Sequence, residues 1–249
     1  MGSKQYDETA DVYDDTLNVL TYARHAEEPT FRAVMGDVRG LDVLDLGAGT
    51  GIWTRRIKRA GAGRVEGLEI SASMVETARE RERGERLGVT YHVGDVARGH
   101  EAVETAAFDV VTGVNVLHYS ASRDELVAMC RTASRALRPG GRLVANCANY
   151  DMPADPDYYG PFGITATVPR PRAAGATVRA HTTMGGRPVD IEFYLWPPGA
   201  YESALREAGF GQVRWHPWRI SPEGIAQYGQ DYWRRYTEHP PTLVLEAVK

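Results

Sequence analysis

The stretch LDVLDLGAGTGIW, residues 41–53, joins an apolar strand to a glycine-rich turn and to the start of a helix. Chains use such a junction to bring backbone N–H groups close to a nucleotide or a related ligand. The spacing of the glycines distinguishes one class of ligand from another. This chain therefore has to be tested first for a dinucleotide, then for a triphosphate, and then for a smaller polar group.

The glycine spacing fits neither phosphate pattern. Gly47, Gly49 and Gly51 lie two residues apart, and Ile52 stands where the dinucleotide fingerprint G-x-G-x-x-G needs its third glycine for helix–strand packing. The triphosphate pattern G-x-x-x-x-G-K-[ST] is absent because no lysine follows the glycines. A ligand with a compact carboxylate and amine remains, and the methionine end of S-adenosylmethionine is such a ligand.

Strand-like and helix-like segments alternate five times around this turn. Apolar strands are expected at 42–46, 64–70, 89–96, 107–117 and 142–150. This alternation is typical of a parallel sheet that is covered by helices on both faces. After a break, strands at 211–218 and 241–248 restore the pattern.

The helical segments carry recognisable start and stop signals. Residues 8–38 read as helical, and Pro29 is expected to divide the stretch in two. A helix should end at the Pro-Gly-Gly of residues 139–141, and another should span 221–239, with Ser221 as its cap and Pro222 as its first residue. Two β-prone segments should turn at Gly185-Gly186.

We expect four regions. Residues 1–40 form a helical lid, residues 41–150 the cofactor-binding core, residues 151–198 a cap, and residues 199–249 complete the core sheet.

Composition and net charge exclude several classes of function. The 249 residues carry a net charge of −4, which gives no reason to expect nucleic acid or an anionic membrane as partner. No apolar run approaches the roughly 20 residues that cross a bilayer, the first residues do not form a secretory signal, and two cysteines are too few for a disulfide framework. A cytoplasmic protein is expected. The preference for arginine over lysine suggests a bacterium with a GC-rich genome.

The segment Asp45-Leu46-Gly47-Ala48-Gly49-Thr50-Gly51 resembles the first motif of the class I S-adenosylmethionine-dependent methyltransferases. GVTYHVGDV and SALREAGF are also similar to stretches of bacterial methyltransferases of secondary metabolism, including antibiotic biosynthesis, such as the toxoflavin type. The resemblance implies an α/β fold with a Rossmann-like, doubly wound, seven-stranded sheet, helices on both faces, an antiparallel last strand, and a cap inserted after the fifth strand. It also implies S-adenosyl-L-methionine as cofactor.

The family places its cofactor contacts at strand ends. Glu69 would accept from the ribose hydroxyls and Asp95 from the adenine amino group, while Asn115 would line the methionine end. The full predicted cofactor set is Tyr6, Tyr13, Asp45, Gly47, Ala48, Gly49, Thr50, Glu69, Ile70, Met74, Gly94, Asp95, Val96, Asn115 and Val116. Met74 could equally be a core residue, and Asp45 could be structural.

The predicted binding site for the methyl acceptor is based on aromatic residues. Tyr6 and Tyr13 belong to a Tyr-Asp-x-x-Ala-x-x-Tyr-Asp-like lead that resembles a lid over the cofactor, although both could simply pack a helix onto the sheet. The predicted substrate contacts are Tyr22, Tyr158, Tyr159, Phe162, Tyr194 and Trp196, which suit a planar small molecule. The alternative is that these rings form a satellite core or a dimer interface.

His118 and Tyr119 follow the fourth strand, beside the expected methyl group. His118 is the candidate general base and Tyr119 could orient the acceptor, but His118 could also only shape the pocket. No metal cluster is expected. The competing hypotheses are a nicotinamide-dependent oxidoreductase and a binding protein without turnover. We expect a small-molecule acceptor as partner, and a monomer or homodimer.

Overall fold

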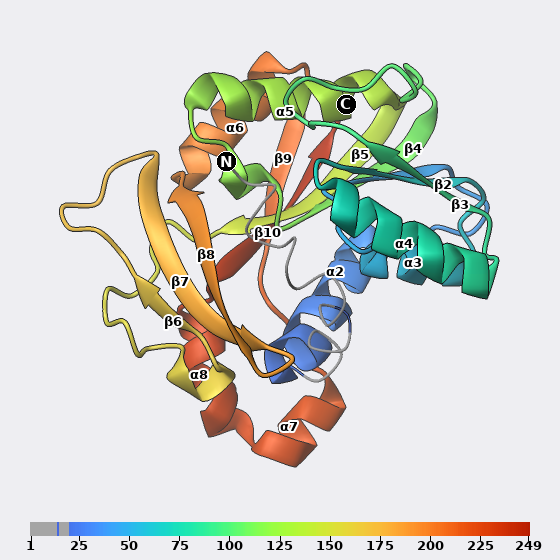
Figure 1. Cartoon of the computed structure of the whole chain (residues 1–249). Coiled ribbons are helices and arrows are strands. Elements are labelled where there is room, and N and C mark those ends of the chain that lie inside the picture. The colour runs from blue at the N-terminus through green and yellow to red at the C-terminus, as the bar shows by residue number, and fades with distance from the viewer. Residues whose placement is uncertain (1–13, 15–19) are drawn as a thin grey trace.

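The computed structural model of the chain describes residue 14 and residues 20–249. A seven-stranded sheet lies at its centre, with the strand order β3-β2-β1-β4-β5-β10-β9 (Figure 1). The strands are Val43–Leu46 (β1), Val65–Glu69 (β2), Val89–Val93 (β3), Phe108–Val114 (β4), Leu137–Ala148 (β5), Gln212–His216 (β9) and Thr242–Val248 (β10). The first five strands pair in parallel, whereas β10 runs antiparallel to both β5 and β9. The predicted Rossmann-like sheet with an antiparallel last strand is confirmed.

The direction of winding changes between β1 and β4. Starting from β1, the chain builds outward to β2 and β3, and then returns to place β4 and β5 on the other side. In sheets of this kind, ligands bind outside the carboxyl ends of the strands where the order reverses. The glycine turn after β1 and the loop after β4 therefore meet at the expected ligand position.

Helices cover both faces of the sheet, as predicted. The main helices are Glu28–Met35 (α2), Ile52–Arg59 (α3), Ala72–Glu85 (α4), Arg123–Ala136 (α5) and Pro198–Glu207 (α6). Val43 and Val110 point into the core that contains residues of α2, α3 and α4, while the next residues, Leu44 and Val111, point into the core of α5 and α6. Two-sided burial explains the nearly continuous apolar strands.

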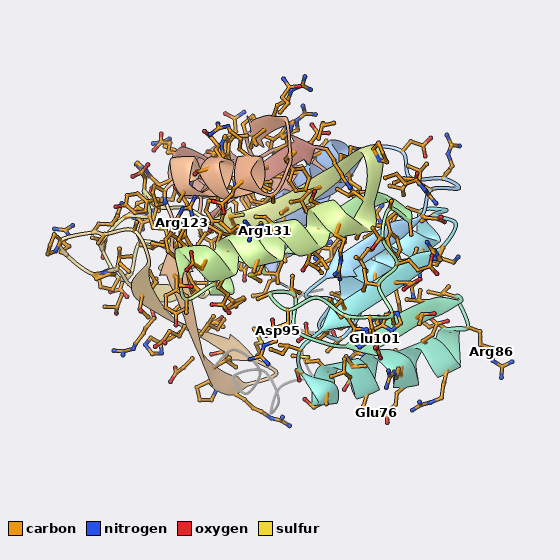
Figure 2. All side chains as sticks on the ribbon, turned by 90° about the horizontal axis from the view of Figure 1, so that it is seen from above. Glu76, Arg86, Asp95, Glu101, Arg123 and Arg131 are labelled. Carbon is orange, nitrogen blue, oxygen red and sulfur yellow. The ribbon has the colours of Figure 1, made fainter. Side chains whose placement is uncertain are left out.

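The outer faces of α5 and α6 are joined by charges. Arg123 and Arg131 each contact the carboxylate of Glu207, at 2.8 and 2.9 Å. Figure 2 shows the two arginines on α5, the helix that lies beside α6.

The insertion after β5 forms a second sheet. It contains a one-turn helix, Gly160–Phe162 (η3), and the antiparallel strands Thr165–Thr167 (β6), Ala176–Met184 (β7) and Arg187–Leu195 (β8). β7 and β8 form the predicted hairpin, which turns at Gly185-Gly186. In Figure 1 this sheet stands beside the carboxyl end of the central sheet, and β8 contacts the short helix Leu117–Tyr119 (η2) that follows β4.

Pro29 does not divide the N-terminal helix, contrary to the expectation. The helix runs unbroken from residue 21 to residue 35, because a π-helical turn, Ala23–Glu27 (η1), precedes the proline. Proline has no N–H to donate to the carbonyl four residues back, and that carbonyl, of His25, accepts instead from the N–H of Ser221 at 2.7 Å. The carbonyl of His25, which Pro29 leaves without a donor in the helix, thus ties the helix to Ser221 in the C-terminal part of the chain.

Two other helix boundaries differ from the prediction. α5 ends at Ala136, so Pro139–Gly141 belong to the start of β5. The segment 221–239 forms two helices, Pro222–Tyr228 (α7) and Gln230–Glu238 (α8), because Gly229 between them has a φ of 78°. Ser221 caps α7 as predicted, accepting from Gly224 N–H at 3.0 Å.

Candidate cofactor and active site

The glycine turn between β1 and α3 needs its glycines for close approach. Gly47 has a φ of 67°, and a Cβ there would lie 2.7 Å from a methyl of Val116. At Gly51, with a φ of 77°, a Cβ would collide with Tyr91 Oη. No described residue lies within 4 Å of the Cβ position of Gly49. The turn is therefore packed tightly at two glycines and open at the middle one.

Glu69, at the end of β2, is joined to this turn. Its Oε2 accepts from the N–H of Gly49 at 3.0 Å, and its Oε1 accepts from the N–H of Ser71 at 2.9 Å. The carboxylate is thus held at the carboxyl end of the sheet beside the open glycine, in the position where the sequence predicts a contact with ribose.

Asp95 lies in the loop after β3. Its Oδ1 accepts from Ala97 N–H at 2.8 Å, and the side chain stays about a third exposed. Figure 2 shows it between α4 and α5. Gly94 precedes it and closes the end of β3 by donating its N–H to the carbonyl of Glu69 at 2.8 Å.

The apolar residues predicted to hold adenine differ in exposure. Ile70 is 46% exposed directly after β2, which is unusual for a large aliphatic side chain and leaves an apolar surface open to a ligand. Val96 is buried, and Met74 is 2% exposed and belongs to the core. This burial favours the core interpretation of Met74.

Asn115 occupies a strained position at the end of β4. Its φ of 55° is left-handed, a region that asparagine tolerates better than most residues, and its N–H donates to Asn146 Oδ1 at 2.5 Å. Its own Oδ1 is buried and has no hydrogen-bond partner among the described residues. Both features are typical of residues that contact a ligand, and they support the prediction that Asn115 does so.

A cavity of about 40 Å³ opens between the glycine turn, the end of β4 and the N-terminal helix. The residues that line it are Ala23, Glu27, Asp45, Gly47, Ala48, Gly49, Ile52, Trp53, Arg56, Val114 and Asn115. The cavity has room for a few water-sized groups, which suits an ammonium and a carboxylate but not a whole nucleoside. The unmet Asn115 oxygen and the open space at Gly49 show that these residues fit the amino-acid end of S-adenosylmethionine.

Asp45 lies buried in the floor of this cavity. Both of its oxygens accept hydrogen bonds of 2.8 Å, from Thr54 and from Thr112, yet burial raises the pKa of its carboxyl to about 6. These bonds tie β1 to α3 and to β4, so Asp45 holds the turn in place as well as lining the cavity. Thr50, predicted as a cofactor contact, uses its hydroxyl to donate to Asp14.

The surroundings of His118 disfavour the general-base role. The side chain is buried in η2, its Nδ1 accepts from Ala148 N–H at 3.1 Å, and desolvation lowers its pKa to about 3. The remaining nitrogen must then carry the proton and act as a donor. Its ring packs at 4.8 Å from Tyr119 and at 5.3 Å from Phe193 of the cap. These contacts favour the alternative, that His118 shapes the pocket.

Several of the predicted acceptor contacts serve as packing residues. Phe162 lies 5.9 Å from Trp233 and 5.3 Å from Tyr236, and Tyr159 is buried and donates to His239 O at 2.8 Å. Tyr158 donates to the carbonyl of Arg235 at 3.3 Å. These three side chains attach the insertion to α8.

The other aromatic residues separate into two places. Tyr22 stacks on Tyr236 at 6.0 Å, close to the cavity residues of η1. Trp196 is buried in the core beneath α5 and α6, where its Nε1 donates to Ser120 O at 3.1 Å, and Tyr194 packs against the same core. The structure therefore does not bring Tyr194 and Trp196 together with Tyr22.

Glu27 and Arg56 are cavity residues that the sequence reasoning missed. Ala23, Glu27 and Phe31 lie four residues apart, so they share one face of the helix, and an acid on that otherwise apolar face was the available signal. Tyr6 and Tyr13 lie outside the described residues. Among the described residues, no group of three or more His, Cys, Asp or Glu side chains could hold a metal ion. None of the described helices has the length and apolar character to cross a membrane.

The chain is similar to known methyltransferases. Residues 43–141 match a family described as a methyltransferase domain. Demethylmenaquinone methyltransferase of Tropheryma whipplei is 33% identical over 143 residues, which cover 57% of this chain and 56% of that protein. The 27-O-demethylrifamycin SV methyltransferase of Amycolatopsis mediterranei is 30% identical over 211 residues, which cover 83% and 65%. The chain thus spans between half and two thirds of the length of these relatives.

The fold is also similar to that of a methyltransferase of known structure. A crystal structure of an S-adenosylmethionine-dependent methyltransferase from Mesorhizobium loti superimposes with a TM-score of 0.66 at 22% identity, covering 94% of this chain and all of that one. Residues 43–141 thus resemble a methyltransferase domain, and the sheet has the fold of S-adenosylmethionine-dependent methyltransferases of known structure. S-adenosyl-L-methionine is the cofactor that this likeness implies.

Proposed function

We propose that the chain transfers a methyl group from S-adenosylmethionine to an N or O atom of a small aromatic or heteroaromatic metabolite. The cavity beside the glycine turn supports this proposal, because it combines three features: Gly49, which no described residue covers, the Asn115 Oδ1, which has no partner among the described residues, and the nearby carboxylate of Glu69. A pyrophosphate at this point would face the buried acids Glu27 and Asp45, which argues against a nicotinamide dinucleotide.

The cofactor supplies a methyl group on a positively charged sulfur, ready for in-line displacement. The chain has to align the acceptor with this methyl group and to exclude water. Alignment by itself accelerates such a reaction strongly. Tyr119 is half-buried in η2, four residues after Asn115, and is placed to orient an acceptor there. The insertion with β7 and β8 packs against the same helix through Phe193 and can close over the acceptor.

Two observations favour a small molecule as acceptor. The two relatives above are named for demethylmenaquinone and for 27-O-demethylrifamycin SV. The chain also has a net charge of −4, which opposes docking to a polyanion. The same proposal includes that the chain acts in the cytoplasm of a bacterium and in secondary metabolism.

Calorimetry with S-adenosylhomocysteine tests the cofactor site directly. The wild-type chain should bind this product, and Glu69→Ala should weaken binding by about 10- to 100-fold, since it removes charge-assisted hydrogen bonds to the ribose. Glu76→Ala, on the outer face of α4 (Figure 2), is the matched control and should bind as the wild type does. Unaltered affinity in Glu69→Ala, or a preference for NADH, would refute the site.

The acceptor is tested separately, by incubating the chain and labelled S-adenosylmethionine with a panel of small N- and O-nucleophiles and with nucleic acid. Label should move to one class of small molecule. Transfer to nucleic acid alone would refute this part of the proposal.

A further inference from the structure

Glu27 is an acid buried beside the glycine turn without a full set of partners. It ends the π-helical turn η1 and is only 7% exposed. Among the described residues its one hydrogen bond comes from Tyr236 Oη, at a long 3.4 Å. A carboxylate in such a place is costly unless something else compensates it.

Its position is fixed from two sides. The carbonyl of His25 accepts from Ser221 N–H at 2.7 Å, and His25 Nδ1 lies 2.8 Å from Ser221 Oγ, so η1 is held against the start of α7. Tyr236 approaches from α8. π-helical turns occur often at functional sites, where they redirect a side chain. Here the turn directs an acid to the cavity rather than to water.

The charged groups around the cavity complement an amino acid. Among the described residues that line it, Glu27 and Asp45 are acidic and Arg56 is basic. Each oxygen of Asp45 accepts a hydrogen bond of 2.8 Å, from Thr54 or Thr112, whereas Glu27 accepts only the long one from Tyr236 among the described residues. The buried Oδ1 of Asn115 has no partner among the described residues. An ammonium ion has three N–H donors, which Glu27 and Asn115 could share.

We infer that Glu27 is the counter-ion of the α-ammonium group of S-adenosylmethionine, with Arg56 facing the α-carboxylate. The inference rests on the proposed function, and it adds a cofactor-positioning residue from outside the strand-end set. Glu27 would act through binding, by holding the amino-acid end of the cofactor in the cavity.

Proton release on binding follows from the same contact. Burial raises the pKa of Glu27 to about 7, so the free carboxyl is half protonated at neutral pH, and an ammonium beside it favours the ionised form. Binding at pH 7 should therefore release about half a proton from Glu27 to the buffer. Asp45, Arg56 and Tyr236 also face this group, and because they remain in Glu27→Gln, comparison with that variant isolates the contribution of Glu27.

The test compares two ligands and three proteins. S-adenosylhomocysteine carries the amino-acid end, whereas 5′-methylthioadenosine is the corresponding thioether without it. Dissociation constants are measured by calorimetry at pH 7, in buffers of different ionisation enthalpy, for the wild type, Glu27→Gln and the exposed control Glu76→Gln. Glu27→Gln should weaken S-adenosylhomocysteine by about 10- to 100-fold, leave 5′-methylthioadenosine unchanged, and lose the proton release. Glu76→Gln should match the wild type.

Each other outcome is decisive. Equal affinity of the wild type and Glu27→Gln for S-adenosylhomocysteine, with or without slower turnover, would overturn the counter-ion role while leaving the proposed function standing. Equal weakening of both ligands in Glu27→Gln would also overturn it, because the effect would then lie outside the amino-acid end. If the wild type bound neither ligand, the proposed function itself would fail.

Discussion

Replacing Glu27 by glutamine should make the ligand-free protein more stable, and the gain should grow with pH. Among the described residues this buried carboxyl accepts one long hydrogen bond, from Tyr236, and desolvation raises its pKa from 4.5 to about 7. Between pH 4.5 and about pH 7, the carboxyl of Glu27 therefore keeps its proton in the folded state and loses it in the unfolded state. A shift of this size corresponds to about 3 kcal/mol between its limits.

The sign follows from the raised pKa. Below about pH 4.5 the group is protonated in both states, so the stabilisation from the raised pKa is fully present, and it is lost as pH rises through 7. Between pH 5 and pH 8 the free energy of unfolding of the wild type should thus fall, relative to Glu27→Gln, by about 2 to 3 kcal/mol. Asp45, whose pKa is raised to about 6, contributes a similar fall, but it does so in both proteins and cancels in the comparison.

Urea denaturation of both proteins at pH 5, 6, 7 and 8 measures this difference. The exposed control Glu76→Gln should keep a constant offset from the wild type over the whole range. If the difference between Glu27→Gln and the wild type were the same at pH 5 and pH 8, Glu27 would be ionised normally in the folded state, and its desolvation by the surrounding helices would be refuted.

Two further predictions concern the glycine turn and His118. Gly51→Ala should destabilise the fold by about 2 kcal/mol or more, because the new Cβ would collide with Tyr91 and the backbone there is left-handed. The control Gly84→Ala lies on α4, where no described residue is near the new Cβ, and should be neutral or stabilising. Equal unfolding curves for the two variants would contradict this reasoning. Replacing His118 by glutamine should change kcat without changing the shape of its pH profile, since the pKa of His118 is lowered to about 3; an inflection near neutrality that disappears in the variant would restore the histidine as a base.

The sheet could be predicted from the sequence because its pattern is local. Each strand is a short apolar run, and the glycine turn stands directly after the first of them, so the residues from Asp45 to Asn115 could be assigned to strand ends without any long-range information. The cavity joins Asp45, Gly47, Gly49 and Asn115 as the order of the strands requires.

Residues that enter the site from another layer could not be predicted in this way. Glu27 reaches the cavity because a π-helical turn and Pro29 fix its helix against α7 and α8, which lie about two hundred residues later in the chain. Pattern reasoning took Pro29 for a break, because proline usually interrupts a helix. It could not show that the carbonyl left without a donor would be taken by Ser221.

Aromatic composition was a weak guide to the acceptor pocket. Core and pocket both bury rings, so the sequence of the insertion is compatible with either. Tyr159 and Trp196 are fixed in packing by hydrogen bonds to backbone carbonyls, whereas Tyr22 lies near the cavity, and only the three-dimensional arrangement separates these cases.

A crystal structure with S-adenosylhomocysteine tests the central claim most directly. The amino-acid end should lie in the cavity between Gly49, Glu27 and Asn115, with the ribose hydroxyls on Glu69 and the adenine beside Ile70. Density for the ligand at any other place, or with the adenine in the cavity and the amino-acid end in solvent, would contradict the assignment of this site.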